Sequence, residues 1–481
     1  MRLRFSLALM QQLSGLDNSF LSMETSTMYG HVTSLAIFEP DTALTIDEVK
    51  KLVASRIHLV PPFRRRLVDV PLGLDHPYWI EDPHFDLDFH IRHIAVPPPG
   101  DEYQLAELSA RIAARHLDRA RPLWEMYIIE GLEGGYTAEL TKIHHACIDG
   151  VSGAEILGVL LDVERTPAPT QPPQTPWQPE NEPSPFEMLG RGMLGIMSKP
   201  RVGLRVARKT LRNGPALMRN FGVTIAPPRP AQLLSRPSEP TPPTPFSGTI
   251  TPHRRFAFGS LPMSDVKAVK NALGGTVNDV VMTMCAGAIR RWLVDHNALP
   301  EAPVHAMVPV SVRTPEQVGT FGNRVSAMVA VLPTNEPDIL VRYRKTHDEM
   351  TVAKEQHGAI PADILQDFAQ FTPPSILGTA SRVIARTKIM DRVNPPFNVV
   401  ISNVPGPQFP LYSAGAKLKG IYPLSAITDG VGLNMTLMSY NGNLDFGLLA
   451  DWDMVPDIWN LIIALADELS DLKKASEELT Q

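Results

Sequence analysis

Prolines divide this chain, because proline lacks a backbone N–H and interrupts both helices and central strands. They gather between residues 166 and 245 in two clusters. The first cluster contains Pro167, Pro169, Pro172, Pro173, Pro176, Pro179, Pro183 and Pro185, and the second contains Pro227, Pro228, Pro230, Pro237, Pro240, Pro242, Pro243 and Pro245. We therefore predict an N-terminal domain at 1–165, a connector at 166–252 and a C-terminal domain at 253–481.

The two long segments on either side of the connector alternate between strand-like and helix-like patterns, which is typical of an α/β fold. In the first segment, His31 to Phe38 predicts a strand and Asp101 to Leu117 predicts an amphipathic helix. In the second, Arg254 to Phe258 predicts a strand, and a helix is expected to begin near Pro262.

The composition is that of an ordinary globular protein, with 43% hydrophobic and 20% charged residues over 481 positions. A net charge of −6 argues against binding to nucleic acid through phosphates. Only Cys147 and Cys285 are present, which predicts neither a disulfide framework nor a structural zinc site and favours the cytoplasm. The apolar part of Met1 to Met10 is too short for a signal peptide, and no stretch is long enough for a transmembrane helix.

The middle of the connector, from Met188 to Asn220, is basic and contains no acidic residue. Its cations are Arg191, Lys199, Arg201, Arg205, Arg208, Lys209, Arg212 and Arg219. A basic amphipathic helix of this kind can lie on an anionic membrane, so we expect peripheral contact with the inner face of the membrane or with lipid inclusions. The alternative is a helix packed across the two domains.

The segment with the clearest chemistry runs from Ala138 through His144 and His145 to Asp149 and Gly150. It predicts a strand that ends in a tight turn, followed by a helix from Ala154 to Leu161. Neighbouring strand residues point to opposite faces, so we expect one histidine to act as a base and the other to be structural. Imidazole titrates near neutral pH and can take the proton of an attacking alcohol. Asp149 is expected to hold the turn.

Other interpretations of the histidines and of the serine after them are weaker. A zinc site at His144, His145 and Asp149 lacks a further ligand cluster, so no metal is predicted. His90 and His93 are interpreted as ordinary surface or interface histidines. Ser152 does not have the spacing of a nucleophile elbow, so direct transfer without a covalent acyl-enzyme is favoured.

The motif from His144 to Gly150 resembles the HHxxxDG motif of coenzyme A-dependent acyltransferases and of condensation domains. Four further segments narrow the resemblance to the bacterial wax ester synthase/diacylglycerol acyltransferase family. They are Leu13 to Leu21 (LSGLDNSFL), Arg121 to Glu125 (RPLWE), Val277 to Val280 (VNDV) and Ser402 to Pro407 (SNVPGP).

This resemblance implies two chloramphenicol-acetyltransferase-like domains with mixed sheets, flanking helices and an active-site tunnel at the domain interface. It implies that His145 is the catalytic base, with His144 and Asp149 beside it, and that Gly150 belongs to the site. It associates Pro122, Leu123 and Trp124 with the acyl pocket, and gives Asn278 and Asp279 a structural or site-shaping role. For Leu123 and Trp124 the alternative is core packing, and for Asn278 and Asp279 it is helix capping and hydrogen bonding.

The resemblance further implies transfer of an acyl group from long-chain acyl-CoA, as co-substrate, to diacylglycerol or a fatty alcohol, with no bound cofactor. A carrier-protein-dependent condensation enzyme and a non-catalytic protein that coats lipid inclusions are the alternatives. The chain departs from the family at two places. Met1 to Leu9 is an extension, so Met10 is an alternative start, and the stretch from Phe246 to Arg255 replaces a run of arginines. Oligomeric state and product preference are not readable from the sequence.

Overall fold

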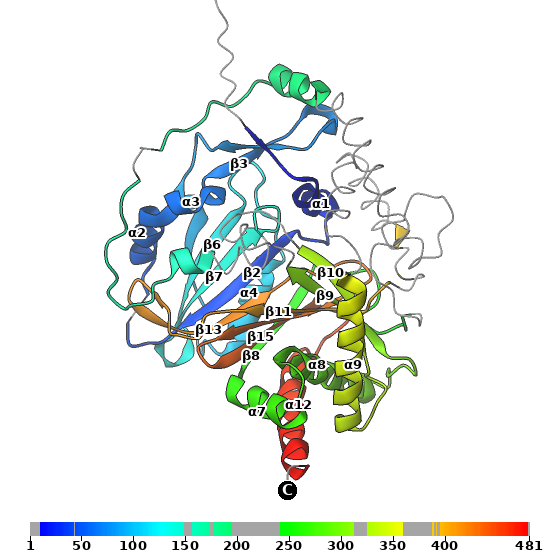
Figure 1. Ribbon diagram of the computed structural model, residues 1–481. Helices are drawn as coiled ribbons and strands as arrows, with labels where there is room; N and C mark the ends of the chain where they lie inside the picture. Colours follow the sequence, from blue (N-terminus) through cyan, green and yellow to red (C-terminus); the bar gives the residue numbers. More distant parts are fainter. Residues whose placement is uncertain are drawn as a thin grey trace, which may run out of the picture.

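The computed structural model describes residues 10–42, 44–148, 156–173, 177–194, 241–311, 325–358, 387–388, 391 and 395–479. Its framework consists of two six-stranded sheets that meet at the centre of the molecule (Figure 1). A separate three-stranded sheet of order β1-β4-β3 lies at one end, formed by β1 (Gln11–Gln12), β3 (Arg65–Val68) and β4 (Tyr78–Glu81).

The N-terminal sheet has the order β12-β13-β2-β7-β6-β5 and is antiparallel except for the parallel pair β5 and β6. Its strands are β2 (His31–Phe38), β5 (Ile91–Ala95), β6 (Trp124–Glu130), β7 (Thr137–His144), β12 (Tyr412–Ser413) and β13 (Ala416–Leu424). The helices of this half include α1 (Gly15–Met23), α2 (Ile46–Arg56), α3 (Leu87–His90) and α4 (Glu102–Ala113). The predicted strand over 31–38 is confirmed. The helix predicted from Asp101 to Leu117 begins as expected, with Asp101 as its N-cap, but ends at Ala113.

The C-terminal sheet has the order β10-β9-β11-β14-β15-β8, with β11 parallel to both of its neighbours. Its strands are β8 (Arg254–Pro262), β9 (Val304–Ser311), β10 (Val325–Leu332), β11 (Val399–Pro405), β14 (Leu433–Tyr440) and β15 (Asn443–Asp451). Four helices pack below it in Figure 1, namely α7 (Met263–Leu273), α8 (Val277–Asp295), α9 (Ile339–Gly358) and α12 (Trp459–Glu478). The predicted strand at Arg254 and the helix after Pro262 are confirmed.

One strand pair crosses between the halves. Although β12 and β13 come late in the sequence, they extend the N-terminal sheet, where β13 pairs with β2. The other four strands of the N-terminal sheet all precede residue 165, and all six strands of the C-terminal sheet follow residue 253. Because β13 also packs against β14 and β15, it joins the two halves physically.

The interface between the halves has its own apolar core. Leu35 and Ile37 of β2 pack there with residues of α4, and Phe256 and Phe258 of β8 contribute from the other sheet. In β2 the alternate residues Ala36 and Phe38 belong instead to the separate core of the N-terminal half. The odd-numbered residues of β2 therefore face the C-terminal half and the even-numbered residues face the other way, because successive side chains of a strand point to opposite faces.

Within the described residues no single helix has the length and apolarity to cross a membrane. Only α7 and α8 together meet that criterion, across a bend of 103°.

Candidate active site

The two motif histidines lie where β7 ends. His31 of β2 pairs with His144, and the next ladder contact is the bond from the His145 N–H to the Gly30 carbonyl, 2.8 Å long. The chain then turns, because the Cys147 N–H donates to the His144 carbonyl at 2.9 Å. His145 is therefore fixed at the mouth of a turn, as the sequence predicts. Asp149 and Gly150 lie outside the described residues.

His144 is buried on the side of the sheet that faces the C-terminal half. Its Nδ1 accepts the Ala146 N–H at 3.0 Å, so the ring proton is on Nε2, which lies 3.3 Å from Oε1 of Glu24. Burial lowers the pKa of His144, although Glu24 opposes this shift. A neutral ring with both nitrogens facing fixed partners is suited to holding the turn in place.

Glu24 follows α1 and is nearly buried. Its carboxylate accepts the Gly30 N–H at 2.8 Å and an N–H of Arg119 at 2.6 Å, and His116 lies 3.6 Å away. Burial alone would raise the pKa of Glu24, but its contacts with His116, His144 and Gly30 together bring the pKa well below its ordinary value. Glu24 therefore supplies a fixed negative charge beside His144.

Gly30 allows this close arrangement. A Cβ at this position would lie 2.7 Å from His144 Nε2 and 2.8 Å from the Phe20 carbonyl oxygen, so any side chain would push the histidine away. Neither Glu24 nor Gly30 is predictable from the sequence, since neither residue has a local pattern that links it to a histidine more than a hundred positions later.

His145 has different surroundings and is only partly buried. Its ring stacks on Phe20 of α1, with centroids 4.7 Å apart and an interplanar angle of 14°. Its Nδ1 lies 3.3 Å from the Ile148 carbonyl oxygen. Because a carbonyl can only accept, Nδ1 carries the proton and the lone pair of the ring resides on Nε2. This is the tautomer that a general base acting through Nε2 requires.

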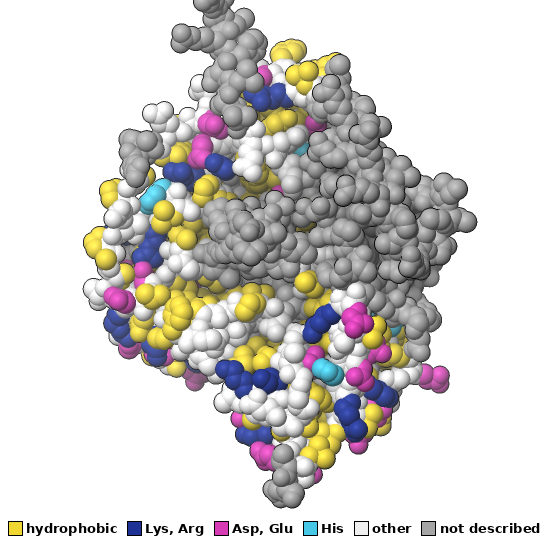
Figure 2. Space-filling view, in the orientation of Figure 1, with side chains coloured by type: hydrophobic (Ala, Val, Ile, Leu, Met, Phe, Trp, Pro, Cys, Tyr) yellow, Lys and Arg dark blue, Asp and Glu magenta, His cyan; other side chains and the backbone are white. Residues whose placement is uncertain are grey.

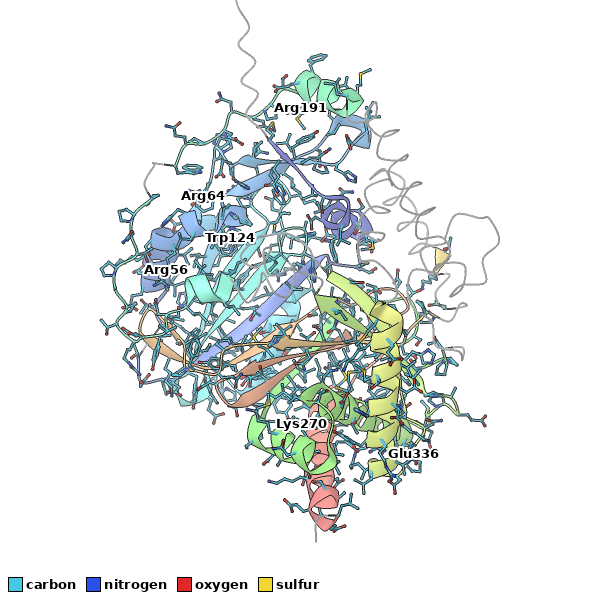
Figure 3. The ribbon with its side chains drawn as sticks, in the orientation of Figure 1. Arg56, Arg64, Trp124, Arg191, Lys270 and Glu336 are labelled. Carbon is cyan, nitrogen blue, oxygen red and sulfur yellow. The ribbon has the colours of Figure 1, made fainter. Side chains whose placement is uncertain are left out.

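The Pro122-Leu123-Trp124 motif joins the histidine pair through the backbone. The Leu123 carbonyl accepts the His144 N–H at 3.0 Å, where β6 begins beside the end of β7. Trp124, which is labelled in Figure 3, donates from Nε1 to the Phe63 carbonyl at 2.9 Å. Leu123 and Trp124 are both fully buried in the core of the N-terminal half. Their association with an acyl pocket stays a prediction.

His90 is not at the surface. Its ring is fully buried and stacks on Trp124, with centroids 4.5 Å apart. Its Nδ1 donates to the Trp124 carbonyl at 2.7 Å. The surface interpretation was wrong for His90, because residues 87–90 form a helical turn that points this side chain inward, whereas His93 is exposed.

Asn278 and Asp279 form a second group, at the start of α8. Asp279 closes a capping box with Thr276, and its Oδ2 lies 3.0 Å from Nδ1 of His347 on α9. Asn278 accepts a long bond of 3.5 Å from the Asn403 side chain on β11. The capping role considered for Asp279 is confirmed, and its partners lie on α9 rather than on β7.

No group of three or more metal-ligating side chains occurs among the residues that the structure describes.

The fold is that of the coenzyme A-dependent acyltransferases and condensation domains. The first condensation domain of the calcium-dependent antibiotic synthetase aligns over 98% of this chain and 97% of its own, with a TM-score of 0.53 at 13% identity. The wax ester synthase/diacylglycerol acyltransferase from Marinobacter aquaeolei VT8 aligns over 97% of this chain and all of its own, with a TM-score of 0.67 at 29% identity.

The sequence defines the family within that class. Residues 13–281 match the wax ester synthase/diacylglycerol acyltransferase catalytic domain, and residues 321–473 match the C-terminal domain of the same family. A Mycobacterium tuberculosis (strain CDC 1551 / Oshkosh) protein named as a candidate diacylglycerol O-acyltransferase is 36% identical over 98% of this chain and 92% of its own. The tgs2 protein of the same strain is 35% identical over 95% of this chain and 98% of its own. The chain belongs to the wax ester synthase/diacylglycerol acyltransferase family and is an acyltransferase.

Proposed function

We propose that this protein transfers a long-chain acyl group from coenzyme A to the hydroxyl of diacylglycerol or of a fatty alcohol, with His145 as general base. The observation that carries the assignment is the position of His145, fixed at the end of β7 with its lone pair on Nε2. The relatives named above as diacylglycerol O-acyltransferases or as a wax ester synthase support the choice of substrates.

In this reaction, Nε2 of His145 removes the proton of the acceptor hydroxyl as its oxygen attacks the thioester carbonyl. The carbonyl becomes a tetrahedral oxyanion, which hydrogen-bond donors must stabilise. When the intermediate collapses, the C–S bond breaks and the imidazolium returns its proton to the departing thiolate. The products are an ester and free coenzyme A, and the histidine is regenerated.

The neighbouring residues hold this base rather than react. His144 and Glu24 fix the turn from the buried side, while Phe20 holds one face of the His145 ring. We assign Asp149 and Gly150 to the same turn. The Leu123 carbonyl supports the end of β7, and we assign the Pro122-Leu123-Trp124 motif to the acyl side of the site. Asn278 and Asp279 shape the opposite wall.

The test is transfer of labelled palmitoyl-CoA to dioleoylglycerol and to hexadecanol in parallel, by the wild type and by His145→Ala. Product that forms with the wild type and falls by about 10²- to 10⁴-fold in the variant is expected for the loss of a positioned base. Near-normal turnover in the variant would remove His145 from this role. Absence of product with either alcohol would instead favour a carrier-protein thioester donor or a coat protein without activity.

We further propose that the protein works at a lipid surface, the membrane inner face or a lipid inclusion, because its acceptor is a lipid. The most exposed large apolar side chains in the described residues are Phe186 at 86% and Leu72 at 84%. Phe186 lies on the helix at 185–194, which packs against Val70, and Met193 and Leu194 of this helix are also exposed. Apolar atoms gather at this apex in Figure 2, and Arg191 marks the helix in Figure 3.

The charge of this apex favours a neutral lipid surface. The helix contains one acid and one base, Glu187 and Arg191, which pair at 3.3 Å. Burial of a large apolar side chain contributes about 1.5–3 kcal/mol, so two such side chains are sufficient to hold the protein on lipid reversibly. The basic residues from Lys199 to Arg219, which lie outside the described residues, would add attraction to anionic lipid.

Flotation with triolein–phosphatidylcholine emulsions and with phosphatidylglycerol vesicles tests both contributions. Phe186→Ser with Leu72→Ser should weaken binding to the neutral emulsion by about tenfold or more. The matched control is Val163→Ser with Leu479→Ser, two side chains that are each 64% exposed elsewhere. Deletion of 195–220 should affect only the anionic vesicles. Unchanged binding of both variants to both lipids would rule out this mode of attachment.

A further inference from the structure

The loop between α1 and β2, residues 24–30, contains two residues that hold the motif histidines. Glu24 at its start lies 3.3 Å from Nε2 of His144. Gly30 at its end accepts the His145 N–H at 2.8 Å, and the Gly30 N–H donates to Glu24 at 2.8 Å. The position of the His145 backbone therefore depends on where this α1–β2 loop lies.

The α1–β2 loop is a compact turn. The Thr25 N–H donates to the Met28 carbonyl at 3.1 Å, and the Thr25 hydroxyl accepts the N–H groups of Thr27 and Met28 at 3.3 and 3.1 Å. Because these hydrogen bonds close the turn on itself, a displacement at its middle also moves its end at Gly30.

The chain at the start of β8 contacts this loop from the other half of the molecule. The Tyr29 hydroxyl donates to the Pro252 carbonyl at 3.0 Å. Arg254 donates to the Thr27 carbonyl, and its guanidinium lies 4.9 Å from the centroid of the Tyr29 ring. Tyr29 is 7% exposed and Arg254 is 4% exposed. We name these two buried side chains the clasp.

Arg254 is also fixed within its own half. It donates to the carbonyls of Thr251 and His253 at 2.5 and 3.0 Å. Thr251 is in turn bound at the end of β15, where Asp451 accepts its N–H at 2.6 Å and its hydroxyl at 2.7 Å. Because the donors of a guanidinium lie in one rigid plane, Arg254 sets a defined distance between the C-terminal sheet and the α1–β2 loop.

A contribution to stability does not explain this arginine well. Within the described chain no carboxylate forms an ion pair with Arg254, and its hydrogen bonds go to neutral carbonyls. Burial lowers its pKa to about 10, although Tyr29, Asp451 and Asp429 oppose the shift, so it is charged at neutral pH. A buried charge without an ionic partner is costly, and an apolar replacement is often at least as stable. The arginine instead supplies a fixed geometry between the halves.

We propose that Arg254 and Tyr29 are positioning residues for acyl transfer, which hold the α1–β2 loop, and through it His144 and His145, in the reactive geometry. The inference rests on the proposed role of His145 as the base. A base must lie within hydrogen-bond reach of the proton that it removes, and a misplacement of about 1 Å costs up to about 10²-fold in rate. The C-terminal half thus takes part in catalysis through the clasp.

Steady-state transfer of palmitoyl-CoA to the preferred alcohol tests the clasp in the full-length protein. Arg254→Met should lower kcat about tenfold and leave KM for palmitoyl-CoA close to the wild-type value, because Arg254 is buried against the loop. Arg254→Lys, which can still donate to a carbonyl, should recover part of kcat.

Arg342→Met is the control for lost stability. Arg342 is likewise buried, at 3% exposed, and its contacts with Glu468 and with the carbonyls of Glu336 and Pro337 all lie in the C-terminal half. This variant should lower the unfolding midpoint and keep kcat per folded molecule near that of the wild type.

Tyr29→Phe keeps the test decisive if Arg254→Met does not fold. It removes only the hydroxyl that bonds to Pro252 and keeps the ring beside Arg254, so kcat should fall severalfold. The matched control is Tyr440→Phe. The Tyr440 hydroxyl also joins the two sheets, through the Leu418 carbonyl at 3.2 Å, but Leu418 pairs with Phe38 at the other end of β2.

A double variant distinguishes positioning from general damage. If Arg254 and Glu24 act through the same loop, Arg254→Met combined with Glu24→Gln should lose much less kcat than the product of the two single losses. Losses that multiply would mean that Arg254 acts independently of the loop and would overturn the inference.

A second readout does not depend on turnover. The ring N–H of His144 is buried, at 1% exposed, and is therefore observable by NMR in protein labelled with 15N-histidine, where His144→Gln identifies its signal. Arg254→Met and Tyr29→Phe should shift this signal or speed its exchange with water. Arg342→Met and Tyr440→Phe should leave it unchanged.

These measurements separate the inference from the proposed function. Clasp variants with the turnover of their controls or with an unchanged His144 signal would overturn the inference, even in an enzyme that depends on His145. A raised KM for palmitoyl-CoA with unchanged kcat would also overturn it, because Arg254 would then bind substrate. If the wild type forms no product, the proposed function fails, and the His144 signal alone decides whether the clasp holds the histidines.

Discussion

The two six-stranded sheets bury different kinds of side chain. The C-terminal sheet and α8 enclose the larger core. This core is apolar and includes Leu437, Met435 and Ile289. The side of the N-terminal sheet that faces them changes along its length. Its paired residues are His31 with His144, Thr33 with Lys142, Leu35 with Leu140 and Ile37 with Ala138.

This change from polar to apolar pairs shows which end of the sheet contains the side chains that are costly to bury. Lys142 is fully buried, and its ammonium bonds to the carbonyls of Ile112 and Arg115 at 3.2 and 2.6 Å. Burial lowers the pKa of Lys142 to about 8. Buried charges of this kind add little stability compared with apolar replacements. They lie at the end of β7 that carries the histidines, whereas the opposite end and the C-terminal sheet provide stability.

The largest expected effect separates stability from activity. Trp124→Ala should lower the free energy of unfolding by about 3–5 kcal/mol and Leu437→Ala by about 2–5 kcal/mol, since both side chains are fully buried. Only Trp124→Ala should also slow the folded enzyme, because the neighbouring Leu123 carbonyl holds His144. Urea unfolding and turnover per folded molecule measure the two effects. Equal loss of turnover in both variants would contradict the assignment of activity to one sheet and of stability to the other.

Asp445 is one of several buried ionisable residues in the C-terminal sheet, and it sharpens the comparison through pH. It is fully buried on β15, where it accepts the Ile421 N–H of β13 at 2.9 Å and the Ser260 hydroxyl at 2.6 Å. Burial raises its pKa to about 6 from an ordinary value of 3.8, although these two hydrogen bonds oppose the shift. The folded state therefore binds this proton more tightly than the unfolded state does.

The associated stability is fully present below pH 4 and is lost as the pH rises through 6. At about 1.4 kcal/mol per pKa unit the loss amounts to about 3 kcal/mol. Asp445→Asn keeps the shape and should flatten this part of the stability profile, making the variant the more stable protein at pH 7. Unfolding midpoints of wild type and variant between pH 4 and 7 measure this difference in stability. A parallel decline in wild type and variant would assign the pH dependence to other groups.

A smaller effect is expected from Glu24→Gln. The amide can still accept the Gly30 N–H, but the negative charge beside His144 and Arg119 is lost. We expect kcat to fall about tenfold, which corresponds to about 1.4 kcal/mol, with KM nearly unchanged. Glu39→Gln is the control, because Glu39 forms a partly exposed pair with Lys417. An equal change in both variants would mean that the charge of Glu24 does not act through His144.

Much of the fold was predictable because its elements carry local patterns. Strand β2 begins and ends at the predicted residues, and α4 begins directly after Asp101, where the amphipathic pattern begins. The place of β13 was not predictable, because its pairing with β2 joins residues almost four hundred positions apart. No local pattern contains such a contact.

The site was predictable to the extent that its residues are adjacent in sequence. The His144–His145 pair, the turn after it and the motif at Leu123 follow from short segments. Glu24 and Gly30 were not predictable, since their role exists only once α1 and β2 pack against β7. For Arg254 the sequence predicts only the start of a strand and a departure from the family. Its burial without a carboxylate partner in the described chain became visible only with both halves in place.

The measurement that tests the central claim most directly is kcat for palmitoyl transfer to the preferred alcohol by His145→Ala, made beside its unfolding midpoint. The account predicts that kcat falls by about 10²- to 10⁴-fold while the unfolding midpoint stays close to that of the wild type. The reason is that the His145 side chain is partly exposed and takes part in the reaction rather than in core packing. Turnover close to the wild-type value in a folded variant would contradict it.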